Sequence, residues 1–229
     1  MLKIDLQLFG GRGSVSGGGL PTGGGGGGGG ISIDSVRNMT SAKNIMGYGP
    51  EVEEVMRAAK EISDRYGVVA NDIQVAQLSG PNAGYVMAYY DEKGNVAINS
   101  KYFNNAKIEG AYERCVKDGF HPSKGNKTGM EATTAHELGH LLTAQAAQRA
   151  GHKDWHATTA PQIVNRAVKA SGAGNAQKLA KAISGYATKN YAECIAEAFA
   201  DVYCNGNKAK RESQAVVKEL NSYFGGKGL

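Results

Sequence analysis

Two histidines and a glutamate lie close together near the middle of the chain, in the sequence His136-Glu137-Leu138-Gly139-His140. On an α-helix the two histidines lie one turn apart on the same face, so both imidazoles can bind one Zn²⁺ ion. The glutamate lies on the adjoining strip of the helix surface, where a carboxylate can take a proton from a metal-bound water. The pattern is short, and two histidines one turn apart also occur by chance on core helices.

The residues around this motif predict the helix that it requires. Thr128, followed by Glu131 three residues later, has the form of a capping box. Apolar residues recur at helical spacing from there to Ala147, and Gly151 is a suitable stop. The sequence therefore predicts a helix over Thr128–Ala147 that carries both histidines and has an apolar stripe facing the core.

Three acids occur at helical spacing further along the chain. Glu193, Glu197 and Asp201 are four residues apart, with an almost entirely apolar sequence between them. Acids on so apolar a helix are costly to bury unless something neutralises them. A zinc ion with two histidines and one glutamate would do so, and this ligand set with an open fourth position is typical of catalytic zinc. The alternative is a stripe of acids that faces water.

Two ligand assignments are compatible with this spacing. In the first, Glu193 binds the metal and Glu197 holds the free N–H of a ligand histidine, as such imidazoles require. In the second, Glu197 binds the metal and Asp201 lies behind it. The spacing alone does not separate them.

The run Tyr186 to Phe199, YATKNYAECIAEAF, together with the H-E-L-G-H sequence, resembles the catalytic domain family of anthrax lethal factor, a gluzincin zinc metallopeptidase. The resemblance implies an α+β zincin-like fold, a small sheet packed on the active-site helix and a helical C-terminal half. It also implies that Glu193 is the third zinc ligand, that Glu197 holds a ligand histidine and that Tyr186 stabilises the tetrahedral intermediate.

The chain departs from that family in two respects. Cys194 and Ile195 replace an aromatic pair that is usual there, which changes core packing and leaves the expected ligands in place. The large substrate-recognition domains of the toxin have no counterpart, so its substrate does not carry over.

The N-terminal region differs in composition from the rest. Residues 1–10 alternate apolar and polar side chains, which predicts a strand, and residues 10–30 are dominated by glycine, which predicts a disordered linker. We therefore expect a segment over residues 1–30 and one domain over 31–229. The opening MLKIDLQLFGGRGS resembles the start of phage minor head and capsid-associated proteins. That resemblance implies a phage or prophage gene and contact with phage head proteins through residues 1–14.

The remaining sequence favours an α+β fold. Helices are predicted from Pro50 to Gly67 and over Ile108–Lys117, Pro161–Ala170, Ala176–Ile183 and Arg211–Phe224, and strands over Ile73–Leu78, Tyr85–Tyr90 and Asn95–Asn99. The last two strands flank a glycine turn and should form a hairpin, whose edge could pair with an extended substrate or simply be an ordinary sheet edge. The loop histidines His121, His152 and His156 could line the site, but none has a partnered spacing, so they are expected to be exposed.

The composition of the chain limits the classes of partner and the cellular location that we expect for the protein. The net charge of +5 comes from lysines and arginines scattered among acids, which argues against a nucleic-acid surface. Cys115, Cys194 and Cys204 make no even disulfide framework, so reduced cysteines and a cytoplasmic folding site are expected. The first ten residues lack the pattern of a signal peptide, and no stretch has the length of a membrane span. We expect a protein of the bacterial host cytoplasm that is also a candidate for incorporation into the virion.

Together these patterns predict zinc-dependent hydrolysis of a peptide bond in a protein or peptide substrate. Glu137 would be the general base, and Tyr186 would donate a hydrogen bond to the developing oxyanion. The alternative is a virion-associated structural or adaptor protein that keeps the fold without turnover. A host-directed toxin would share the chemistry and differ in destination.

Overall fold

The computed structural model describes residues 38–44, 49–79, 83–91 and 93–229, with the backbone alone for 38–44. The strand predicted for residues 1–10, the glycine-rich linker and the residues 1–14 that resemble phage head proteins lie outside the described residues. The described part is α+β: seven α-helices accompany one small mixed sheet. Among these residues no helix combines the length and the apolar character that crossing a bilayer requires.

The sheet has the strand order β1-β2-β4-β3. Its strands are β1 (Asn38–Asn44), β2 (Asp72–Ser79), β3 (Ala88–Tyr90) and β4 (Asn95–Asn99). The predicted hairpin is confirmed, because β3 pairs antiparallel with β4 and places Tyr90 opposite Val96. Gly94 has a φ of 88° in the turn, a conformation that favours glycine. In the strand order, β3 forms one edge of the described sheet.

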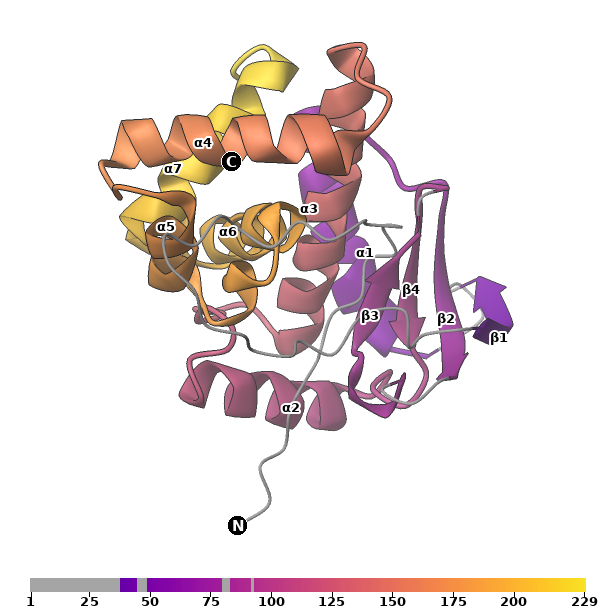
Figure 1. Cartoon of the computed structure of the whole chain (residues 1–229). Coiled ribbons are helices and arrows are strands. Elements are labelled where there is room, and N and C mark those ends of the chain that lie inside the picture. Colours follow the sequence, from indigo (N-terminus) through magenta and orange to yellow (C-terminus); the bar gives the residue numbers. More distant parts are fainter. Residues whose placement is uncertain (1–37, 45–48, 80–82, 92) are drawn as a thin grey trace.

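Helix α3 (Gly129–Arg149) stands between the sheet and the helical half of the protein, as Figure 1 shows. The predicted capping box is present, since the Thr128 side chain accepts from the Glu131 backbone and the Glu131 side chain accepts from the Thr128 backbone. Around α3 lie α1 (Glu51–Tyr66), α2 (Asn105–Lys117), α4 (Ala160–Ser171), α5 (Ala176–Ile183), α6 (Tyr191–Asn205) and α7 (Arg211–Asn221).

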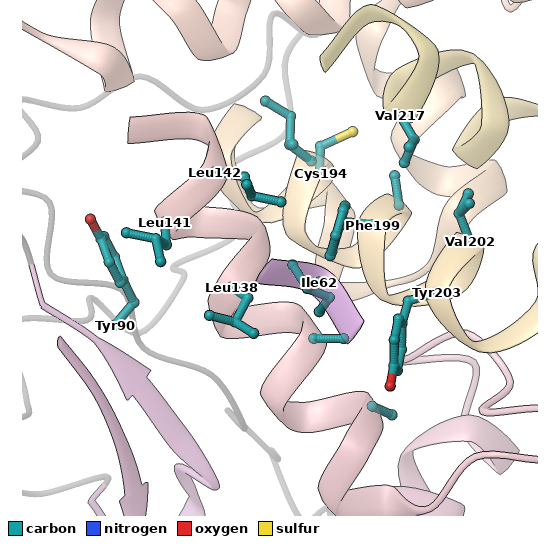
Figure 2. Close-up of a cluster of buried hydrophobic side chains, with 14 of the residues drawn as sticks. Ile62, Tyr90, Leu138, Leu141, Leu142, Cys194, Phe199, Val202, Tyr203 and Val217 are labelled. Carbon is teal, nitrogen blue, oxygen red and sulfur yellow. The ribbon is translucent and has the colours of Figure 1, made fainter. Parts of the chain in front are cut away.

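The core packs against two sides of α3. In Figure 2, Leu141 points toward Tyr90 of the sheet, while Leu142 points toward Cys194 and Phe199 of α6. All five residues are buried. Because α3 is covered on both sides, its histidines sit in the middle of the protein rather than on its surface. The three cysteines are free thiols.

Two details of the predicted elements are wrong. Apolar spacing predicts that α1 buries Val52, Val55, Met56, Ala59, Ile62 and Tyr66. The helix does bury Val55, Ile62 and Tyr66, but it buries Ala58 as well and leaves Met56 38% exposed. The predicted strand from Tyr85 begins only at Ala88. Residues Ala83–Tyr85 form a 3₁₀ turn, whose carbonyls accept hydrogen bonds from side chains rather than from a neighbouring strand.

Candidate metal centre

The two histidines of α3 and the first acid of α6 converge on one point. Oε2 of Glu193 lies 3.2 Å from Nε2 of His136 and 3.3 Å from Nε2 of His140. One ligand atom from each of the three residues lies within 4.8 Å of the others, and each residue is about 1% exposed. Neither ring nitrogen of His140 has a hydrogen bond with good geometry to a described residue. A buried imidazole nitrogen without such a bond, facing a carboxylate, fits a shared cation, so the group could hold a metal ion.

Local sequence signals place these ligands on their helices. His136 and His140 lie one turn apart on α3, and their ring centroids are 5.0 Å apart. On α6 the side chain of Asn190 caps the helix by accepting from the backbone N–H of Glu193 at 2.8 Å. The cap fixes where α6 begins, and therefore which face of the helix carries Glu193.

Gly139 lets the two ligand helices approach each other. A Cβ atom at this position would lie 3.0 Å from Cα of Ala196 and 3.2 Å from Cβ of Phe199. These are backbone-near atoms of α6 that a rotamer change cannot move away. The glycine of H-E-L-G-H therefore allows the close packing that brings Glu193 to the histidines.

Gly139→Ala should accordingly lower the melting temperature and weaken metal binding. An alanine in a helix interior is normally worth about 1 kcal/mol over glycine, but forcing α3 and α6 apart costs about 1–3 kcal/mol. Gly110→Ala on α2 is the matched control, because its Cβ would meet only the Arg114 side chain at 3.5 Å, and it should raise the melting temperature. Thermal unfolding of both variants tests the pair, and equal stabilisation by the two substitutions would contradict the close-packing explanation.

Glu197 contacts the other ring nitrogen of His136, the one that does not face Glu193. Its carboxylate lies 2.9 Å from Nδ1 of His136 and 3.0 Å from Nδ1 of His121, and it accepts a hydrogen bond of 2.7 Å from the Ser184 hydroxyl. A carboxylate that holds the free nitrogen of a ligand imidazole fixes its tautomer and orientation. The third acid, Asp201, accepts hydrogen bonds from the Lys210 backbone at 3.0 Å and from the Asn205 side chain at 2.8 Å.

The expectation that His121 is exposed is wrong, since it is 3% exposed and stacks on Tyr112 with ring centroids 5.4 Å apart. Its loop docks on the turn before α6, where the Tyr186 N–H donates to the Phe120 carbonyl at 3.1 Å. No spacing in the sequence links a loop histidine to a glutamate 76 residues away. His152 and His156 are both partly buried rather than exposed, and His152 is 2.9 Å from the hydroxyl of Thr159.

Glu137 is fully buried next to the three candidate ligands. Burial raises the pKa of its carboxyl to about 8, and the negative charge of Glu193 adds to this, while His136 and the backbone of Tyr90 act in the opposite direction. This pKa belongs to the metal-free protein, and a cation bound beside the carboxyl would lower it toward the range in which a general base works near neutral pH.

Tyr186 faces the same cluster from the 3₁₀ turn Tyr186–Thr188. Its hydroxyl donates to Oε1 of Glu193 at 3.3 Å, and the Nζ of Lys189 donates to the hydroxyl at 3.3 Å. Burial, with the charge of Glu193 second, raises the pKa of the phenol well above its ordinary value. Tyr186 therefore stays protonated and is able to donate a hydrogen bond.

The pKa values predict how the metal-free protein responds to pH. Burial alone would raise the pKa of Glu197, but His121 and then His136 lower it to about 2. Burial alone would lower the pKa of His136, but Glu193 and Glu197 raise it to about 10. The Glu197 contribution to stability is thus complete above its ordinary value of 4.5 and is lost as pH falls toward 2. The His136 contribution is complete below 6.5 and is lost as pH rises toward 10.

We therefore expect EDTA-treated protein to melt at its highest temperature between these two ordinary values and to lose stability on both sides. A bound metal requires neutral histidine ligands, so zinc-loaded protein should keep its melting temperature on the alkaline side. Melting curves of both forms across the pH range measure this. An alkaline loss of equal size in the two forms would contradict it.

A cavity of about 470 Å³ lies beside His140, between the β3–β4 turn and the segment after α3. Tyr90 and Trp155 line it, and their ring centroids are 6.3 and 6.2 Å from that of His140. Both aromatic rings therefore border the cavity and also pack near His140, which is not itself one of the lining residues. The candidate ligands themselves are buried, so a large molecule would reach them only if the residues that cover them moved.

Comparisons with known proteins give no match: no family model fits the chain, and no curated protein or solved structure is significantly similar to it. The function is therefore inferred from the site and from the two sequence resemblances.

Proposed function

We propose that this protein is a zinc-dependent metallopeptidase with a zincin-like domain. The observation that carries the proposal is the position of one Glu193 oxygen between Nε2 of His136 and Nε2 of His140, with the buried carboxylate of Glu137 beside them. Two imidazoles and one carboxylate form a ligand set typical of catalytic zinc. The small sheet beside α3 and the helical second half support the zincin-like architecture.

The ligand assignment with Glu193 in the third position is supported by the other contacts of Glu197. The Glu197 carboxylate already contacts the side chains of His136, His121 and Ser184. In the alternative assignment Asp201 would lie behind Glu197, yet Asp201 accepts from Asn205 at 2.8 Å near the end of α6. His136, His140 and Glu193 would thus hold the ion, and Glu197 would orient His136.

A zinc ion in this group would activate water and polarise the peptide carbonyl. Glu137 would accept the proton of the attacking water and later pass it to the leaving amine. The Tyr186 hydroxyl would move its hydrogen bond from Glu193 to the carbonyl oxygen as negative charge develops there. The cavity beside His140 would receive substrate residues next to the cleaved bond.

A purely structural zinc site would require neither Glu137 nor Tyr186, and this favours the enzyme over a virion-associated structural protein. The direct test is metal analysis of the purified protein combined with digestion of an unbiased peptide library. We expect about one zinc per chain and cleavage that is lost on chelation. Protein that contains no zinc, even after refolding with it, would refute the proposal.

Tyr186→Phe should lower kcat on the order of 10²–10³-fold, the loss expected when one oxyanion donor is removed. Zinc content should not change, because the phenol is not among the candidate ligands. Tyr112→Phe is the matched control, since it also removes a buried hydroxyl, one that lies 3.3 Å from the Pro122 carbonyl and outside the metal group. Steady-state kinetics of both variants decide the matter, and equal kcat values for the two would remove Tyr186 from the mechanism.

A further inference from the structure

The side chain of Lys189 places an ammonium group next to the buried phenol of Tyr186. It follows directly after the Tyr186–Thr188 turn, is partly buried, and places its Nζ 3.3 Å from the Tyr186 hydroxyl and 5.0 Å from the centre of the ring. Among the described residues Lys189 forms no ion pair within 4.0 Å, whereas the partly buried Lys124 and Lys127 pair with Glu109 and Glu61.

The contacts of Lys189 with the Tyr186 hydroxyl and ring offset only part of the free-energy cost of burying its ammonium group. Withdrawing an ammonium group from water costs free energy unless a carboxylate or several acceptors replace the lost hydration. Burial accordingly lowers the pKa of Lys189, and Glu193 opposes this only from a distance beyond ion-pair contact. A long lysine side chain at the protein surface is free to extend into water instead. The contact with Tyr186 therefore calls for another reason.

Two hydrogen bonds connect Lys189, Tyr186 and Glu193 in series, each with the earlier residue as the donor. Lys189 donates to the Tyr186 oxygen, and the Tyr186 hydroxyl donates to Oε1 of Glu193. The other oxygen of Glu193, Oε2, faces the two histidines. Because the ammonium occupies one side of the phenol oxygen, the single phenol proton is left to point toward Glu193, one of the three candidate ligands. A positive charge on the acceptor side also polarises the O–H bond and strengthens it as a donor.

We propose that Lys189 is a positioning residue that aims and strengthens the Tyr186 hydroxyl as a hydrogen-bond donor toward the substrate carbonyl oxygen. The role rests on the proposed peptidase function and adds to it a cation that acts through the tyrosine. It predicts that the effect of Lys189 disappears when the Tyr186 hydroxyl is absent, which a merely structural lysine would not do.

The test compares Lys189→Met and Lys189→Arg in the wild-type and Tyr186→Phe backgrounds. Methionine keeps the apolar stem and removes the charge, and arginine keeps a donor that is always charged. In zinc-loaded enzyme Lys189→Met should lower kcat about 10-fold with KM unchanged, the size expected for one charge-assisted hydrogen bond. Lys189→Arg should recover most of that loss, and Lys189→Met should have no further effect on Tyr186→Phe.

A second readout needs no turnover. Protein loaded with Co²⁺ is titrated with acetohydroxamate, whose carbonyl oxygen stands in for that of the substrate, and binding is followed by visible absorption. Lys189→Met should weaken this binding about 10-fold, again only when the Tyr186 hydroxyl is present. The melting temperature should stay the same or rise, because a partly buried cation that forms no ion pair with the described residues is removed. Lys181→Met, at an exposed position on α5, is the matched control and should change none of these measurements.

Two outcomes would overturn the role of Lys189. One is wild-type kcat and acetohydroxamate affinity in Lys189→Met, and the other is a loss of equal size in both backgrounds with a lower melting temperature, which would mark a structural residue. Both outcomes leave an active metal-loaded enzyme, so they are distinct from failure of the proposed function. Wild-type protein that binds neither Zn²⁺ nor Co²⁺ would refute the proposed function and this role with it.

Discussion

Glu137→Gln should leave the protein folded and zinc-loaded while lowering turnover on the order of 10³–10⁴-fold, the upper range for loss of a general base. Glutamine has nearly the same shape and remains able to accept a hydrogen bond, but it does not take a proton. The side chain is fully buried and its carboxyl pKa is raised to about 8 in the metal-free protein. An uncharged amide in this position should therefore not destabilise the fold.

The measurement is kcat with a library-derived peptide, together with zinc content and a melting curve. Glu131→Gln, in the capping box at the start of the same helix, is the control and should retain full turnover because glutamine also serves in such caps. Equal activity of wild type and Glu137→Gln, with zinc confirmed in both, would mean that the hydrolysis comes from a contaminant. The structural alternative would then be favoured.

Removal of a candidate ligand should have the second large effect. His136→Ala, His140→Ala and Glu193→Ala should each yield protein that loses its zinc on dialysis against a chelator. Two remaining ligands cannot hold the ion as three do. The Glu193 change should be the most severe for the metal-free fold as well, because its Oε2 is the atom that faces both imidazoles.

Glu197→Gln and Asp201→Asn separate the two ligand assignments. Loss of the carboxylate behind His136 should weaken zinc affinity about 10–100-fold without abolishing binding. The Asp201 change should leave zinc affinity unaltered, because its carboxylate contacts Lys210 and Asn205 near the end of α6. Competition with a chromogenic chelator gives all the affinities. Full zinc in Glu193→Ala with complete loss in Glu197→Ala would reverse the assignment.

Much of the local structure could be predicted because its causes lie within a few residues of each other. The Thr128 and Glu131 cap, the one-turn spacing of His136 and His140, and the glycine of the β3–β4 turn are all present. Periodicity also located the helices closely, and it failed where two adjacent helix faces were similarly apolar, as at Met56.

Contacts between distant segments could not be predicted in this way. The sequence predicts an exposed His121, because a loop histidine has no local reason to be buried, yet the docking of its loop against Tyr186 places it against Glu197. The position of Lys189 against the phenol likewise depends on how the turn before α6 packs. Such contacts are set by the packing of whole elements, which no spacing in the sequence encodes.

By itself the sequence determined which residues could do the chemistry: two imidazoles on one helix face, a carboxylate next to them, and acids at helical spacing on a second apolar helix. It left open which acid meets the histidines, because Glu193 and Glu197 lie on the same face of α6 and differ by one turn. The tertiary structure decided between them through the approach of α6 to Gly139, where the helices pack almost backbone to backbone. That approach brings Glu193 to both Nε2 atoms and leaves Glu197 at the far nitrogen of His136.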